Sequence, residues 1–308
     1  MNMIKYIVKR ILISIPVLIG VMLIIFLLLN VVPGDPITLM MREHIKPDLI
    51  EKMREQMGLD DPVMVRFLRY MKNAAMGDFG ISYKLNRNVT DLIINAFPHT
   101  LRLSIFAALI AWIIGIPAGI ISAVKKNTFI DRFFMSFSLL GVSMPVFWAA
   151  LLLQYIFAFK LKLLPVSGYS SIKHLIMPAI VLGWSSAGTI ARLTRSSLLE
   201  IMKNDFIRTA RAKGLKETLV VVGHALKNAM LPVVTVMAIQ VASLLSGAVI
   251  TESVFGIPGI GRLSVNAIQN RDMPLLQGTV VFTTLLIIAG NLVADILYSV
   301  IDPRIRVD

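Results

Sequence analysis

Six long apolar runs, separated by shorter polar stretches, form the main pattern along this chain. They are continuous, whereas strands of a membrane barrel alternate apolar and polar positions over about ten residues. Most of them approach or exceed the roughly 20 residues with which an α-helix crosses a bilayer. The pattern therefore predicts an all-α integral membrane protein with six transmembrane helices, at about Ile11–Val32, Thr100–Val124, Phe133–Phe159, Leu175–Ile190, Val233–Ile250 and Leu275–Ile301.

The composition supports a membrane protein. Apolar residues make up 56% of the chain and charged residues 16%, whereas soluble domains carry about 25% charged residues. The first run is longer than the roughly 7–15 residues of a signal-peptide core, and no small-residue cleavage site follows it. We expect it to be retained as the first span. Gly115 and Gly119 form a GxxxG pair, which permits close helix contact.

The distribution of Lys and Arg predicts the orientation. The stretches 1–10, 125–132, 192–228 and 302–308 hold 16 Lys/Arg in 62 residues, against 5 in 39 for the connections 159–174 and 252–274. Basic residues concentrate in cytoplasmic loops, so both termini are expected in the cytoplasm of a multi-pass protein. Three lysines do not follow this rule, because they lie in a connection assigned to the outside: Lys160, Lys162 and Lys173.

The chain divides into three parts under this topology. Residues 1–32 form the cytoplasmic end and the first span, and residues 98–308 a five-helix core. Residues 33–97 form a small external segment with nine Lys/Arg and nine Asp/Glu. Within it, PDLIEKMREQMGL predicts a short helix opened by Pro47 and closed by Gly58.

No enzyme chemistry is evident. The chain has no cysteine, no phosphate-binding loop, no zinc-binding His-Glu-x-x-His and no nucleophile elbow, and its four histidines are scattered. We therefore expect no cofactor or metal in this chain. Its net charge of +13 is explained by topology and contact with membrane lipid rather than nucleic acid. Asp295 and Glu252 are the only deep carboxylates; a structural ion pair with an arginine is the favoured role for Asp295, and proton-coupled transport is the alternative.

A basic, helix-forming segment interrupts the apolar pattern at residues 203–228. Phe206, Ile207 and Ala210 recur at helical spacing between Lys and Arg, and Gly214 breaks the helix. The pattern predicts two short helices on the inner membrane face. They could lie on anionic lipid or dock into a groove of a cytoplasmic partner.

The segment resembles the cytoplasmic EAA loop of ABC-transporter permeases. RTARAKGL and HALKNAMLPVVT are similar to the version found in dipeptide, oligopeptide and nickel importers, in which arginine (here Arg208) replaces the usual glutamate. The similarity runs through the chain in order: KRILISIPVLIGVMLIIFLLLNVVPGDP, MGDFGISY, AVKKNTFIDR, GVSMPVFW, LPVSGYSS, ESVFGIPGIGR and DILYSVIDPRIR.

The resemblance implies the fold and role of a type I ABC importer permease in a bacterial or archaeal plasma (inner) membrane. Expected partners are a second homologous permease, two cytoplasmic ATPases that bind ATP and Mg, and an extracytoplasmic peptide-binding protein. The substrate would be a di- or oligopeptide, with a nickel chelate or glutathione as alternatives in the same family. The ATPase-coupling residues would be Arg208, Ala210, Arg211, Ala212, Lys213, Gly214 and Leu215.

Two further sets of residues are candidates for transport. Polar or small residues at helical spacing could line the path or bond neighbouring helices: Ser185, Thr189 and Arg192, and Gln240, Ser243 and Gly247. Outside, ESVFGIPGIGR could form a gate or contact the binding protein through Phe255, Pro258 and Gly259, or be only a structural turn.

Overall fold

The computed structural model describes residues 3–31, 58 and 60–301, and it confirms the all-α fold. The only β-pairing in this part of the chain is an isolated bridge between Ile81 and Asn88. The helices, of which η1 and η2 are π-helical, are α1 (Met3–Val31), α4 (Val63–Ala75), α5 (Val89–Val124), α6 (Phe129–Ser143), α7 (Val146–Leu153), η1 (Gln154–Lys160), α8 (Lys173–Ile201), α9 (Asp205–Ala212), α10 (Glu217–Leu219), η2 (Val220–Ala225), α11 (Leu226–Leu245), α12 (Val249–Phe255), α13 (Ile260–Gln269) and α14 (Met273–Ile301).

Five of the described helical segments are long and apolar enough to cross a membrane, and a bent pair supplies a sixth. The expected third span, Phe133–Phe159, is not one helix: α6 and the α7–η1 segment meet at 107°. Pro145 is the N-cap of α7 with a non-helical ψ of 130°, and it has no N–H with which to extend the hydrogen bonding of α6.

The expected fifth span also has different bounds. Helical backbone runs from Glu217 to Leu245, so the span begins within the basic segment. It ends before Gly247, whose φ of +110° breaks the helix. Residues 249–250 of the expected span therefore belong to the separate helix α12.

The core of the bundle is the packing of α5 on α8. A Cβ added to Gly115 would lie 2.8 Å from the Ala187 oxygen, and one added to Gly119 would lie 2.6 Å from the Ala191 oxygen. Only glycine permits this backbone approach. The GxxxG pair is thus a helix contact within this chain.

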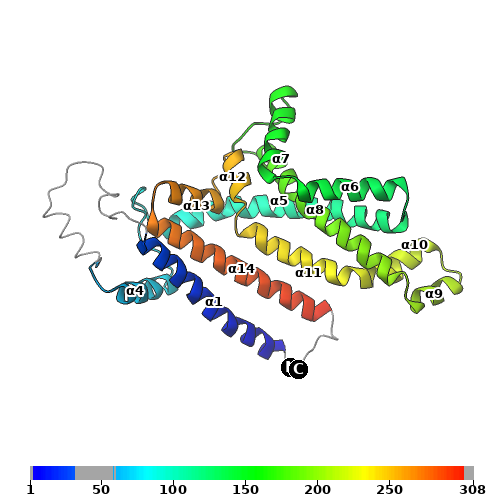
Figure 1. The fold of residues 1–308 in the computed structure, drawn as a ribbon, viewed down its shortest axis with the longest axis horizontal. Coiled ribbons are helices and arrows are strands. Elements are labelled where there is room, and N and C mark those ends of the chain that lie inside the picture. The colour runs from blue at the N-terminus through cyan, green and yellow to red at the C-terminus, as the bar shows by residue number, and fades with distance from the viewer. Residues whose placement is uncertain (1–2, 32–57, 59, 302–308) are drawn as a thin grey trace.

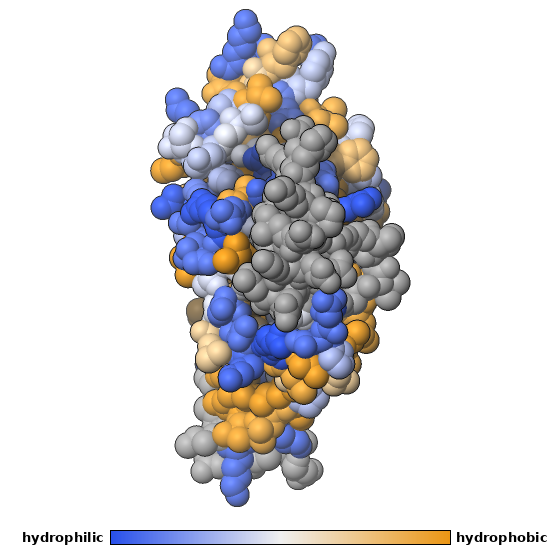
Figure 2. Space-filling view, turned by 90° about the vertical axis from the view of Figure 1, so that its left-hand side faces the viewer, coloured by the Kyte–Doolittle hydropathy of each residue, from blue (hydrophilic) through white to orange (hydrophobic). Residues whose placement is uncertain are grey.

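The long helices lie side by side, with α11 between α14 and the α5–α8 pair (Figure 1). Helices α9 and α10 lie at one end of the bundle, and α4, α12 and α13 lie toward the other. Figure 2 looks onto the second end, where hydrophilic residues gather above a hydrophobic flank. This separation is typical of a protein with two wetted ends and an apolar belt.

Helix α1 packs along α14 and leaves most of its surface exposed. An ion pair joins the two helices, with Arg10 Nη1 3.1 Å from Asp295 Oδ2. The pairing of Asp295 with an arginine, expected from the sequence, is confirmed.

The described part of residues 33–97 is fastened to the bundle by Asp272. This buried carboxylate, at the start of α14, accepts hydrogen bonds from the Ser82 hydroxyl and from the backbone N–H groups of Tyr83 and Lys84. The short helix expected between Pro47 and Gly58 lies outside the described residues.

Candidate coupling site and transport path

Helix α9 has one buried and one open face. Ile207 is fully buried and Ala210 is buried with it, against Leu198 of α8 and Ala229 of α11. The cluster also contains Ala123 of α5 and Val220 and Val221 of η2. The loop is thus attached by apolar packing to three long helices. A displacement of α9 would be transmitted to all three, because packed interiors resist deformation.

The open face of α9 carries the charges. Of the seven predicted coupling residues, Ala210 is buried and Leu215 is half-buried, while the other five are exposed: Arg208, Arg211, Ala212, Lys213 and Gly214. Arg208 lies 3.5 Å from the exposed Asp205. Lys213 forms no ion pair with any described residue. These cations are available to a partner or to lipid headgroups.

Gly214 forms the turn after α9 and has empty space beside it. Its φ is +74°, a conformation that residues with a Cβ rarely adopt. A Cβ built on it would meet no atom within 4 Å. The glycine is therefore needed for its backbone angle, and its own chain leaves room for another surface to approach.

A bidentate ion pair closes the turn at Gly214. Arg211 donates from Nε to Glu217 Oε2 at 3.0 Å and from Nη2 to Oε1 at 2.7 Å. These hydrogen bonds to Glu217 raise the pKa of the Arg211 guanidinium above its ordinary value. The pair holds α9 and α10 together across Gly214. Sequence reasoning missed Glu217 because only the turn brings position i+6 opposite Arg211.

A second ion pair anchors the same end of the bundle. Arg195 of α8 donates two hydrogen bonds, of 2.7 and 2.8 Å, to Asp131 at the start of α6. The Asp131 side chain is 5% exposed and also accepts from the Asn127 N–H at 2.9 Å. This contact fixes α6 to α8 three residues before Leu198, a member of the cluster beneath α9.

The three path candidates on α8 share one side of the helix. Ala187 and Ala191 face α5, Gly188 lies against Ser138 of α6, and Ile190 packs with Val233 of α11. At about 100° per residue, Ser185, Thr189 and Arg192 fall on the remaining side. Ser185 and Thr189 are half-buried and Arg192 is exposed. This side is open to a partner, lipid or solute.

Only two of the second set of path candidates, Gln240 and Ser243, lie within α11. Gln240 turns toward α8, where its side-chain nitrogen donates to the Ser186 oxygen at 3.4 Å. Ser243 is exposed. Gly247 lies in the turn after α11, where a Cβ would come within 3.0 Å of the Gly261 nitrogen. The spacing expected for Gly247 assumed that the helix continues through it, whereas α11 ends at Leu245.

The stretch 252–262, expected on the outside, is organised around Glu252. This carboxylate is fully buried; it accepts from Thr100 Oγ1 at 2.7 Å and from the Arg262 N–H, in the first turn of α13, at 3.0 Å. Thr100 in turn accepts from the Ile260 N–H at 2.8 Å. Burial raises the pKa of Glu252, and its hydrogen bonds oppose that rise.

The three gate candidates differ in how far they are buried. Phe255 and Gly259 are buried and Pro258 is half-buried. A Cβ on Gly259 would collide with the Glu252 carboxyl group. Two of the three candidates therefore pack inside this chain.

Among the described residues, no group of His, Cys, Asp and Glu could hold a metal ion.

Residues 115–307 match the family described as the binding-protein-dependent transport system inner membrane component, and residues 3–104 match its N-terminal component. The chain is 41% identical to the dipeptide transport system permease protein DppB of Alkalihalophilus pseudofirmus, over 99% of this chain and 100% of that protein. It is 42% identical to the glutathione transport system permease protein GsiC of Escherichia coli K12, over 99% of both.

Solved structures support the fold. An inward-facing structure of the MetNI methionine ABC transporter matches with a TM-score of 0.59 at 17% identity, covering 68% of this chain and 96% of that one. Permeases of this kind work with ATPase and binding-protein partners and do not hydrolyse ATP themselves. The chain belongs to the family of multi-pass inner-membrane permease components of binding-protein-dependent ABC importers, in its peptide and glutathione branch.

Proposed function

We propose that this chain forms half of the translocation path of an importer of di- and oligopeptides. A second, homologous permease would form the other half, and two cytoplasmic ATPases and an external peptide-binding protein would complete the complex. Two relatives of the chain are named for a dipeptide and for glutathione, which is itself a small peptide. A nickel chelate remains the alternative cargo.

The observation that carries this proposal is the loop at residues 203–228. One face of this loop is packed on α5, α8 and α11, and the opposite face is basic. The space beside Gly214 is empty. A short helix of this kind can dock into a groove of an ATPase and pass that subunit's movement to the spans. Arg208 and Lys213 would orient the partner through charge more than they would add affinity.

A coupling role for this loop would imply which end of the bundle faces the cytoplasm. The end that carries α9 and α10 would lie in the cytoplasm, where ATP is available. Helix α1 begins, and α14 ends, toward that same end of the bundle (Figure 1). Both termini would therefore be cytoplasmic, in accord with the distribution of Lys and Arg.

The path would run along the open side of α8. Ser185 and Thr189 can donate and accept hydrogen bonds from a peptide backbone, and Arg192 lies further along the same side. Gln240 of α11 reaches the same helix and has an Oε1 with no hydrogen-bond partner among the described residues. Such a surface would discriminate weakly among side chains and leave selection to the binding protein.

Purification of the tagged chain in mild detergent tests the assembly. We expect two ATPase subunits and a second permease to co-purify. The reconstituted complex should take up alanyl-alanine in the presence of ATP and the binding protein, and competition with glutathione and with nickel-histidine would rank the cargoes. Recovery of a folded chain alone, which then moves solute under a pH gradient, would support a proton-coupled carrier instead.

Gly214 variants test the coupling role. Gly214→Asn keeps the left-handed turn accessible with a small side chain, and we expect it to retain coupled uptake. Gly214→Trp fills the empty space and should lower uptake at least tenfold per ATP hydrolysed, while membrane insertion is unchanged. Equal uptake per ATP in the two variants would contradict the coupling role.

A further inference from the structure

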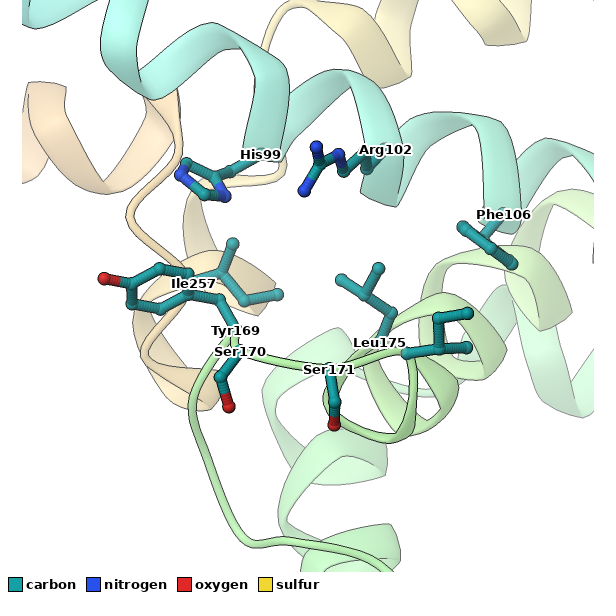
Figure 3. Close-up of a pocket in the computed structure, with 9 residues that line it drawn as sticks. His99, Arg102, Phe106, Tyr169, Ser170, Ser171, Leu175 and Ile257 are labelled. Carbon is teal, nitrogen blue, oxygen red and sulfur yellow. The ribbon is translucent and has the colours of Figure 1, made fainter.

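A cavity of about 340 Å³ opens near the outer end of α5. It lies between α5, the connection that leads into α8, and Ile257 after α12 (Figure 3). His99 and Arg102 extend from α5 toward this connection. The Tyr169 ring packs edge-on against the His99 ring, with 5.0 Å between the ring centroids.

The polar groups directed into the cavity are cationic or neutral. The Ser170 and Ser171 hydroxyls point away from α5 (Figure 3), and Ser171 hydrogen-bonds His174. No Asp or Glu lines the cavity, and the exposed Arg102 forms no ion pair with any described residue. A guanidinium without a counter-ion beside a cavity is suited to a carboxylate, which it can bind with two parallel hydrogen bonds.

The remaining wall is apolar. Phe106, Ile172, Leu175 and Ile257 contribute to it. Binding sites for small ligands occupy about 300–1,000 Å³ and combine apolar walls with a few polar groups. This cavity is at the lower limit, so it suits a single amino-acid residue rather than a long chain.

We propose that this cavity binds the C-terminal residue of a peptide, with the carboxylate on Arg102 and an apolar side chain on Phe106 and Leu175. The inference rests on the proposed peptide import and adds a substrate subsite in the permease itself. A peptide released at the outer end would be held there by its free carboxylate before it enters the path. His99 and Tyr169 would border the carboxylate.

Saturation-transfer NMR on the full complex in lipid nanodiscs, without the binding protein, tests this subsite. The probes are alanyl-phenylalanine and its C-terminal amide. We expect saturable transfer to the phenyl ring of the acid and little to that of the amide. Arg102→Gln should weaken binding of the acid at least about tenfold, since a charge-assisted pair is lost, and Arg102→Lys should restore part of it. Lys173→Gln is the matched control, because Lys173 is exposed and follows the lining residue Ile172.

Equal binding of acid and amide, absence of saturable binding to the wild type, or equal effects of Arg102→Gln and Lys173→Gln would each overturn the subsite. If Arg102→Gln instead weakens association of the binding protein and leaves binding of the dipeptide unchanged, the cation serves that protein and the subsite is again overturned. Uptake of alanyl-phenylalanine by the wild-type complex is measured in parallel. Uptake without subsite binding rejects this inference alone, whereas absence of any peptide uptake rejects the proposed function.

Discussion

Two glycines at opposite ends of the bundle have opposite surroundings. Gly214, in the loop after α9, has no atom of this chain within 4 Å of where a Cβ would be. Gly259, at the start of α13, has the Glu252 carboxyl group in that position. The first is surrounded by exposed cations, and the second by buried, fully hydrogen-bonded groups. The sequence alone does not distinguish these two glycines, but only Gly214 leaves space for another molecule.

The same contrast extends to the charged groups. Near α12 and α13, Glu252 and Asp272 are buried and serve backbone N–H groups of their own chain. In the α9 loop, Arg208 and Lys213 are exposed. A buried charge must be satisfied within the fold, whereas an exposed charge can be used by a partner. The surroundings of Glu252 thus satisfy its charge within the fold, whereas the exposed face of the α9 loop leaves its cations accessible.

The largest effect on stability is expected from Gly259→Ala. The new Cβ would displace the Glu252 carboxylate from its hydrogen bonds, and overpacking together with an unpaired buried charge should cost more than about 3 kcal/mol. Gly214→Ala, which meets only the backbone penalty of a positive φ, should cost about 1–2 kcal/mol. Thermal unfolding of the two purified variants compares them. Equal midpoints would show that the two glycines do not differ as described.

Arg195→Gln should have the next largest effect. It leaves Asp131, whose side chain is 5% exposed, without its cation, at a cost of about 3 kcal/mol. Asp131→Asn leaves only the more exposed Arg195 unpaired and should cost less. The measurement is the unfolding midpoint of each variant and of the double variant. A double variant less stable than Arg195→Gln would contradict this account.

Glu252 gives a pH test of the packing around Gly259. Because burial raises its pKa, the folded state holds the proton more tightly than the unfolded state does. Stability should therefore fall as pH rises from the ordinary glutamate pKa through the raised one, and be constant above it. Glu252→Gln should remove this slope. Unfolding midpoints of both proteins over this pH window measure it, and parallel curves would contradict a raised pKa.

Most of the fold followed from the sequence, because apolar length alone identifies spans. The bend at Pro145 and the helix end before Gly247 did not, since proline and glycine are tolerated within spans as well as between them. The α9 loop was evident because basic residues interrupt an apolar chain. The roles of Thr100 and Glu217 were not, because only the fold brings Thr100 to Glu252 and Glu217 to Arg211.

The smallest effect on stability, and the sharpest test of the contrast, is expected from the Arg211–Glu217 pair. Both side chains are substantially exposed, at 40% and 53%, so Glu217→Gln should cost less than about 1 kcal/mol. If the α9 loop is built for contact, the pair's role is to hold α9 and α10 in the orientation that a partner receives. Glu217→Gln should then reduce uptake per ATP several-fold in the reconstituted complex while the unfolding midpoint barely moves. The exposed Glu200→Gln, on α8 before the loop, is the matched control and should change neither quantity. A fall in uptake no larger than that of the control would mean that this ion pair belongs to the surface and not to the coupling site.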